Sequence, residues 1–257
     1  MAAISYDSPV VLREFAARRG ITFPLLADSS SVVIARFGLR QEHGQAYATS
    51  FVVDASGVIR AKNQEESIVY RRTGASILLG SGAAPAGSAS LQETPYFTLR
   101  ATPSNDVVGP GQRITLALDF AFKPGLHAYA PGSHSYRPLS LSWDTHPRVR
   151  AAPPAVFPQP KAYLFRPLNE TVPVYEGSFR VLQDVVMHDV PVGWAQDLLD
   201  ATPDRFEPVV LNGSLAYQVC SDTTCYPPDT LALRVPLKLR PKDEIRARPE
   251  LRRPEAP

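Results

Sequence analysis

The stretch ITLALDF, residues 114–120, alternates large apolar side chains with smaller or polar ones. A period of two places every second side chain on the same face of a strand, so this stretch predicts a strand with one face toward a core. The stretch FTLRA, residues 97–101, has the same pattern. Turns that contain Pro and Gly separate four further predicted strands, at residues 139–143, 179–187, 211–219 and 231–239. This series is typical of two packed antiparallel sheets and predicts an all-β sandwich.

Proline usage divides the chain into two parts. Of 26 prolines in 257 residues, three (Pro9, Pro24 and Pro85) precede residue 91 and the other 23 follow it. Helix interiors exclude proline, whereas turns and strand edges accept it. Residues 80–94 read GSGAAPAGSASLQET, a composition typical of a linker. We therefore expect domains at 1–79 and 95–240, a linker at 80–94 and a solvated tail at 241–257. Residues 194–199, WAQDLL, are expected to form a short helical or irregular excursion.

The first part has the pattern of an α/β unit. Residues 2–6 suit a short buried strand, and Ser8 and Pro9 supply a helix N-cap and a first helical residue. That helix is expected to reach Arg19, with Gly20 as its C-cap. Further predicted elements are helices at 31–37 and 68–79 and strands at 49–54 and 58–62.

Two stretches of this first part carry a family resemblance. AISYDSPVVLREFAARRGITFPLLAD (residues 3–28) and SFVVDASGVIRAK (residues 50–62) resemble the later two thirds of a thioredoxin-fold redoxin of the AhpC/TSA group. The resemblance covers residues 2–79 and implies a partial thioredoxin-like unit. The family's reactive cysteine would lie upstream of this match, and Ala48 stands where redoxins often have a cis-proline.

The same resemblance implies a gap in the sheet. The family's strand before the reactive cysteine lies between those at residues 2–6 and 49–54, and here no residues are left to form it. We expect Met1 to be an internal start, a fragment boundary or a gene-model error, with a rearranged sheet as the alternative. On this basis the chain could also be the remnant of a peroxiredoxin-like peroxidase whose cysteine lies upstream of Met1.

Both cysteines of the chain lie in YQVCSDTTCYPP, residues 217–228. Four intervening residues are enough to turn a strand back and to bring two sulfurs within disulfide reach. This segment resembles the active-site segment of the N-terminal domain of DsbD, an immunoglobulin-like thiol:disulfide interchange domain. KPGLHAYAPG (residues 123–132) and TVPVYEG (residues 171–177) are similar to earlier segments of such domains, so the resemblance spans most of residues 95–240.

The resemblance to DsbD implies a function. Cys220 and Cys225 would be a redox pair that exchanges its disulfide with a thioredoxin-like protein partner, with Cys225 as the entering cysteine. An aromatic residue of a cap loop shields this pair in the family, and the loop around residues 163–167 is expected there, with Phe165 as the shield. A working exchanger of this type implies an extracytoplasmic, periplasmic location, although no signal sequence is present.

A second interpretation of the cysteine pair stays open. Two cysteines at this spacing could simply join a hairpin in a non-catalytic binding module. A zinc site is not supported, because zinc takes four ligands and the nearest preceding histidine, His188, lies in a strand pattern. We expect neither a metal nor a cofactor. His127, His134 and His146 have no serine elbow nearby, so no hydrolase triad is indicated.

Charge and hydropathy exclude two further classes of partner. Lys and Arg number 27 against 25 Asp and Glu, and they are spread along the chain, so nucleic acid is not an expected partner. No run reaches the roughly 18 to 20 apolar residues of a bilayer span. Any electrons must therefore come from a separate protein.

Overall fold

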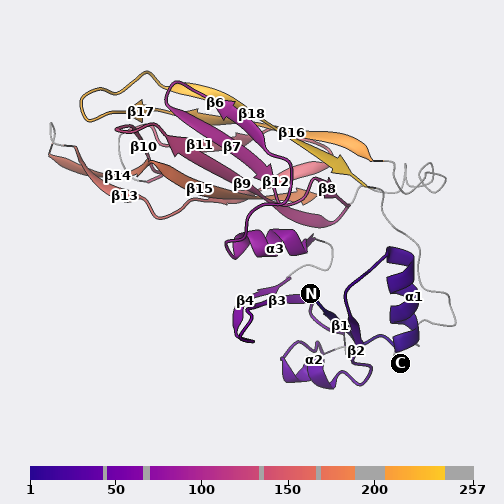
Figure 1. Cartoon of the computed structure of the whole chain (residues 1–257). Helices are drawn as coiled ribbons and strands as arrows, with labels where there is room; N and C mark the ends of the chain where they lie inside the picture. Colours follow the sequence, from indigo (N-terminus) through magenta and orange to yellow (C-terminus); the bar gives the residue numbers. More distant parts are fainter. Residues whose placement is uncertain (43–44, 66–69, 133–135, 166–168, 189–205, 241–257) are drawn as a thin grey trace. The chain divides into compact units, whose positions relative to one another are not determined.

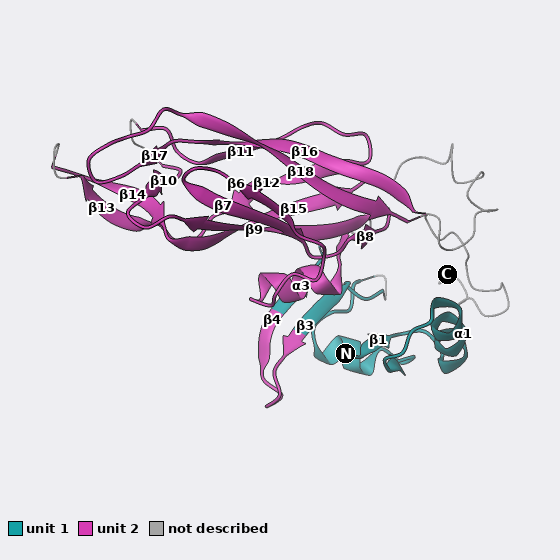
Figure 2. Cartoon of the chain, turned by 45° about the horizontal axis from the view of Figure 1, so that its top comes forward, with its two compact units in different colours: residues 1–51, 62–66, 243–257 teal, residues 52–61, 67–242 magenta. Residues whose placement is uncertain are grey.

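The structure is a computed structural model that describes residues 1–42, 45–65, 70–132, 136–165, 169–188 and 206–240 (Figure 1). The expected excursion at residues 194–199 and the expected tail at 241–257 lie outside the described residues. The chain divides into two compact units (Figure 2). The first contains residues 1–51, 62–66 and 243–257, and the second contains residues 52–61 and 67–242.

The N-terminal elements form where the sequence predicts them, but the strand expected to be buried is not, because Ile4 at its centre is 49% exposed. Strand β1 (Ala3–Ser5) pairs in parallel with β2 (Leu25–Ala27), and helix α1 (Pro9–Arg19) connects them. The Ser8 hydroxyl accepts a hydrogen bond from the Val11 amide, which confirms the N-cap. Gly20 has φ 59° and ends the helix in the left-handed conformation, as expected of a glycine C-cap.

The hairpin of β3 (Thr49–Val53) and β4 (Ile59–Gln64) is also confirmed. Its turn is organised by Asp54, whose Oδ1 accepts hydrogen bonds from the amides of Ser56 and Val58. The short helix α2 (Val32–Arg36) lies within the predicted range 31–37. Among the described residues, β1 and β2 form one two-stranded sheet and β3 and β4 form another.

The second unit is a β-sandwich (Figure 1). One sheet has the order β12-β15-β9-β7-β6 and the other has the order β11-β16-β18-β8. All six predicted strands are present, as β7 (Phe97–Pro103), β9 (Gln112–Phe122), β11 (Ser140–Trp143), β15 (Ser178–Met187), β16 (Glu207–Tyr217) and β18 (Asp229–Leu239). The sheets also contain β6 (Ser90–Glu93), β8 (Val107–Val108) and β12 (Val149–Val156), which were not predicted.

The apolar residues of the predicted strands form the core between these sheets. Along β7, Phe97, Leu99 and Ala101 are buried while Thr98 and Arg100 are more exposed, as the alternation predicts. The fold class is therefore the expected one, a small α/β unit followed by an immunoglobulin-like β-sandwich. Two strand pairs are parallel within an otherwise antiparallel arrangement: β18 with β8, and β9 with β5 (Arg71–Arg72).

The helix predicted at residues 68–79 is wrong in its first part. Arg71–Arg72 form a strand, β5, that pairs in parallel with β9, and helix α3 (Gly74–Gly80) begins only after the N-cap Thr73. Backbone hydrogen bonds from Arg71 to Gly111 and from Thr73 to Arg113 hold this segment extended. Tertiary pairing with the sandwich thus overrides the local helical pattern.

A third sheet lies at one end of the sandwich and is called the end sheet below (Figure 1). Its order is β13-β14-β10-β17, and all its pairings are antiparallel. The strands are β10 (His127–Tyr129), β13 (Lys161–Phe165), β14 (Glu170–Glu176) and β17 (Val219–Cys220). The limits expected for the domains and the linker stay a prediction, although Ser90–Glu93 of the expected linker is strand β6 and pairs with β7.

Candidate functional site

The two cysteines of the chain form a disulfide bond at the end of β17. Cys220 is the last residue of that strand, and its Cα lies 4.0 Å from the Cα of Cys225. Four residues, Ser221 to Thr224, form the loop between them. The strand β17 pairs with β10, so the disulfide is attached to the edge of the end sheet.

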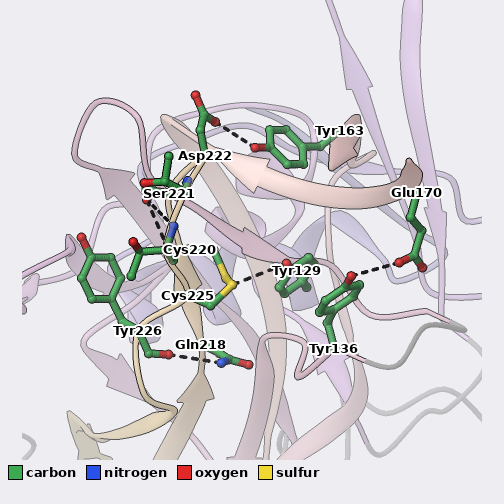
Figure 3. The surroundings of a disulfide bond; sticks show 12 residues. Tyr129, Tyr136, Tyr163, Glu170, Gln218, Cys220, Ser221, Asp222, Cys225 and Tyr226 are labelled. Atoms are coloured by element: carbon green, nitrogen blue, oxygen red, sulfur yellow. Dashed lines mark hydrogen bonds between the residues drawn. A yellow bond between two sulfur atoms is a disulfide. The ribbon is translucent and has the colours of Figure 1, made fainter. Parts of the chain in front are cut away.

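Local hydrogen bonds explain why this sequence folds into a tight loop (Figure 3). The Ser221 hydroxyl accepts from the amides of Thr224 and Thr223, at 3.0 and 3.3 Å, and the Ser221 amide donates to the Thr224 carbonyl at 2.7 Å. On the return strand, the Tyr226 amide donates to the Val219 carbonyl at 2.9 Å. The Gln218 side chain donates to the Tyr226 carbonyl at 3.2 Å. The residues that flank the cysteines therefore fix the hairpin in which the disulfide sits.

The two cysteines differ in their exposure to solvent. Cys220 is buried, with 1% of its surface exposed, whereas Cys225 is an exposed residue. A thiolate that attacks a disulfide must approach one of its sulfurs directly. Cys225 is therefore the more exposed residue of the pair.

Alternate residues of the end sheet face opposite sides. Ala128, Tyr175 and Val219 are part of the main core of the sandwich. Their strand neighbours Tyr129, Val174 and Cys220 form a second, smaller cluster with Val172, and Tyr136 and Tyr163 pack against that cluster. We call the face of the end sheet that carries this cluster the site face. It places Cys220 in an apolar and aromatic environment.

Two stacked tyrosines lie beside the disulfide (Figure 3). The Tyr129 hydroxyl lies 3.8 Å from the Cys225 sulfur, and because a disulfide sulfur carries no hydrogen, the phenol is the donor. The Tyr129 ring stacks on that of Tyr136, with centroids 4.3 Å apart, and the Tyr136 hydroxyl donates to a Glu170 carboxylate oxygen at 2.9 Å. Burial raises the pKa of Tyr129 to about 12, so its phenol remains a proton donor at neutral pH.

Tyr163 connects the end sheet to the cysteine loop. Its hydroxyl donates to Asp222 Oδ1 at 2.8 Å (Figure 3). Its ring centroid lies 4.3 Å from that of His127. His127 is 3% exposed, and its Nε2 atom is buried and has no hydrogen-bond partner in the described structure. Burial lowers the pKa of His127, while the negative charges of Asp222 and Glu176 act in the opposite direction.

The expected cap loop is wrong for residues 163–165, and residues 166–167 lie outside the described residues. Residues 163–165 belong to strand β13, because they pair with residues 170–172 of β14. The Phe165 ring lies 6.4 Å from that of Tyr136, whereas the Tyr129 hydroxyl lies 3.8 Å from the Cys225 sulfur. Tyr129, which lies in the segment KPGLHAYAPG, is therefore an aromatic residue in contact with the pair that was not predicted to have this role.

In the described ranges, no three His, Cys, Asp or Glu side chains come together in a group that could hold a metal ion. None of the helices that the structure describes is long and apolar enough to span a lipid bilayer.

Comparisons with known proteins give two family matches and one solved structure. The family model of the AhpC/TSA family matches residues 1–62. The crystal structure of the N-terminal periplasmic domain of ScsB from Proteus mirabilis aligns with a TM-score of 0.41 and 16% identity, over 61% of this chain and 54% of that chain. No curated protein matches. The model named "Thiol:disulfide interchange protein DsbD, N-terminal" matches residues 98–236, which is more than half of the 257 residues. The chain therefore belongs to the family of DsbD N-terminal domains.

Proposed function

We propose that the chain is a thiol–disulfide oxidoreductase that exchanges its Cys220–Cys225 disulfide with a thioredoxin-like protein. Family membership and the disulfide support thiol–disulfide interchange in general. The observation that carries the finer proposal is the difference in exposure between the exposed Cys225 and the buried Cys220. One sulfur is accessible to a partner, and the other is held where it can complete the exchange.

The exchange has two steps. In the reduced chain, the Cys225 thiolate attacks a disulfide of the partner, forms a mixed disulfide and releases one partner sulfur as a thiolate. The Cys220 thiolate then attacks the Cys225 sulfur, which re-forms the Cys220–Cys225 bond and releases the second partner thiolate. Two electrons pass from the chain to the partner, and the reverse sequence reduces the chain.

We infer that this exchange takes place outside the cytoplasm. Disulfides form and persist in oxidising compartments such as the periplasm, and they are rare where glutathione and thioredoxin keep thiols reduced. The AhpC/TSA-like part, residues 1–62, contains no cysteine, so it supplies no thiol for the exchange or for a peroxidase reaction. A peroxidase role would need a cysteine outside the given sequence.

Single-cysteine variants of the full chain test the proposal. Cys220→Ala leaves the exposed Cys225 without its resolving partner, so it should accumulate a mixed disulfide with an oxidised thioredoxin. Cys225→Ala leaves only the buried Cys220 and should form far less of this adduct. Non-reducing electrophoresis and mass spectrometry measure both adducts.

A purely structural disulfide gives a different result. Its loop encloses only four residues, so the chain-entropy model assigns the bond at most about 2 kcal/mol of stability. In that case both variants would melt at a lower temperature and neither would form an adduct with thioredoxin. Such an outcome would reject the exchange function and leave a non-catalytic binding module.

A further inference from the structure

His127 lies beside the buried cysteine of the pair. The two residues are direct register partners of the antiparallel strands β10 and β17. Direct partners place their side chains on the same face of a sheet, with Cβ atoms about 4.5 to 5.5 Å apart. The next pair along, Ala128 and Val219, faces the main core, whereas Cys220 belongs to the cluster of the site face. His127 and Cys220 are therefore neighbours on the site face.

The Nε2 atom of His127 has an unused capacity for hydrogen bonding. It is buried and has no partner among the described residues, and the residue as a whole is only 3% exposed. Buried polar atoms are nearly always paired, because an unpaired one loses its bonds to water without replacement. In the disulfide state Cys220 carries no proton to offer. Reduction creates an S–H group at Cys220, which gives this nitrogen a donor nearby.

The groups around the imidazole determine its protonation. Glu176 is the register partner of His127 on β14, and its carboxylate bonds the Lys161 ammonium at 2.7 Å. Asp222 of the cysteine loop contributes a second negative charge, and its carboxylate accepts from Tyr163. Two tyrosines also lie near the imidazole: Tyr163 of β13, at a centroid distance of 4.3 Å, and Tyr129 of β10, at 5.9 Å. Burial outweighs both carboxylates and lowers the pKa of His127, so the imidazole is neutral and able to accept a proton at pH 7.

We propose that His127 is the proton acceptor for the Cys220 thiol in the resolving step of the exchange. The proposal rests on the proposed function. Nε2 takes the proton of the Cys220 S–H group, and the resulting thiolate attacks the Cys225 sulfur. The bond between Cys225 and the partner sulfur breaks, and its electron pair leaves on the partner as a thiolate. In the reverse direction, the imidazolium returns the proton to Cys220 as this sulfur leaves.

Stopped-flow absorbance with dithiobis(nitrobenzoate) as the disulfide probe separates the two steps. When the reduced full chain is in excess, attack by Cys225 releases the first thionitrobenzoate in a bimolecular phase. Attack by Cys220 on the mixed disulfide releases the second in a unimolecular phase. We expect His127→Gln to slow the second phase by about tenfold or more at pH 6.5, and to leave the first phase unchanged.

The dependence of the second phase on pH identifies the role of the side chain. Without a proton acceptor, resolution follows the thiolate fraction of Cys220, so its rate should rise about tenfold per pH unit below the thiol pKa. With His127 present, the rate should vary much less between about pH 6 and pH 8. If the side chain had a purely structural role, its substitution would lower the rate of the second phase at every pH without changing the slope of that rate against pH.

Matched variants keep the test decisive. His146→Gln removes a histidine outside the end sheet and should leave both phases as in the unmodified chain. His127→Phe retains a planar apolar ring beside Tyr163 but offers no acceptor, so it should reproduce the slow second phase even if His127→Gln folds poorly. If the second phase of His127→Phe had the same rate and the same dependence on pH as in the unmodified chain, this proposal would be overturned. Absence of the second phase from the unmodified chain would instead overturn the exchange function.

Discussion

Tyr163 has two contacts at the site that can be separated by substitution. Its ring packs beside His127 and the cluster that contains Cys220, and its hydroxyl bonds Asp222 in the cysteine loop. Tyr163→Phe removes only the hydroxyl. A net contribution of about 1 kcal/mol from this hydrogen bond corresponds to about a fivefold change in how often the loop opens. We therefore expect dithiothreitol to reduce the disulfide of Tyr163→Phe about fivefold faster.

Alkylation of the released thiols, followed by mass spectrometry, measures this rate. Tyr47→Phe is a suitable control, because Tyr47 is an exposed residue of the first unit and should leave the rate unchanged. A reduction rate for Tyr163→Phe equal to that of the unmodified chain would show that the hydrogen bond does not restrain the loop.

The disulfide partners could be predicted from the sequence, because only four residues separate them and the motif is local. The other contacts of the site could not. Tyr163 and Asp222 are 59 positions apart, and His127 meets Cys220 only because β10 pairs with β17. Such contacts depend on which strands pair and in which register, and local sequence patterns do not reveal this at the level of individual residues.

The segment formed by β5 and α3 packs on the sandwich through a polar group of contacts. The Arg72 guanidinium forms an ion pair with the Asp184 carboxylate on β15, and the side chains of both residues are less than one third exposed. Ser76 of α3, which is fully buried, shares a hydrogen bond of 2.6 Å with Thr115 of β9. Thr115 also donates to Asp184 at 2.9 Å. These contacts cover the second face of β9, which explains why Thr115 is buried as well as its apolar neighbours.

Loss of the ion pair should destabilise the sandwich. Arg72→Met leaves the Asp184 carboxylate partly buried and without its cation, and we expect a loss of about 1 to 3 kcal/mol. Urea unfolding, followed by the fluorescence of Trp143 on β11, measures this change. Arg60→Met is the control, since the Arg60–Asp54 pair lies at an exposed turn and should not affect the sandwich transition. Equal midpoints for the two variants would show that Arg72 does not anchor the segment.

Strands with a regular alternation were predicted, and interrupted ones were not. β7, β9 and β18 carry their apolar residues at a period of two. β12 contains Pro153 and Pro154 and has a register shift between Ala152 and Val156, so its pattern is broken. β14 also contains a proline, Pro173, and β10 has only three residues. Short or proline-containing strands carry too little pattern to be recognised before their partners are known.

The two units differ in how much apolar surface they bury. In residues 1–51, the buried apolar side chains are Leu12, Ile34 and Leu39, while Ile4 and Leu26, which are register partners on β1 and β2, are each 49% exposed. The sandwich buries a continuous core in which Phe97, Leu99, Ile114 and Leu116 have no exposed surface. The sequence predicted two parts from proline usage and family resemblance, but it could not show this difference, because burial depends on which sheet faces are covered.

Amide hydrogen exchange of the full chain should reveal this difference as unequal protection. Local opening costs little free energy where few apolar contacts are lost, so the amides of α1 should exchange at least about tenfold faster than those of β9 and β15. The two strands share a continuous antiparallel register from Ser178↔Ala121 to Val186↔Arg113, and the core lies against them, so their amides should exchange only through larger openings. Mass spectrometry of peptides from one labelled sample compares both regions under identical conditions. If α1 exchanged as slowly as β9, the first unit would be stabilised by more than the three apolar side chains that are buried among its described residues, and the estimate of its stability from burial would be wrong.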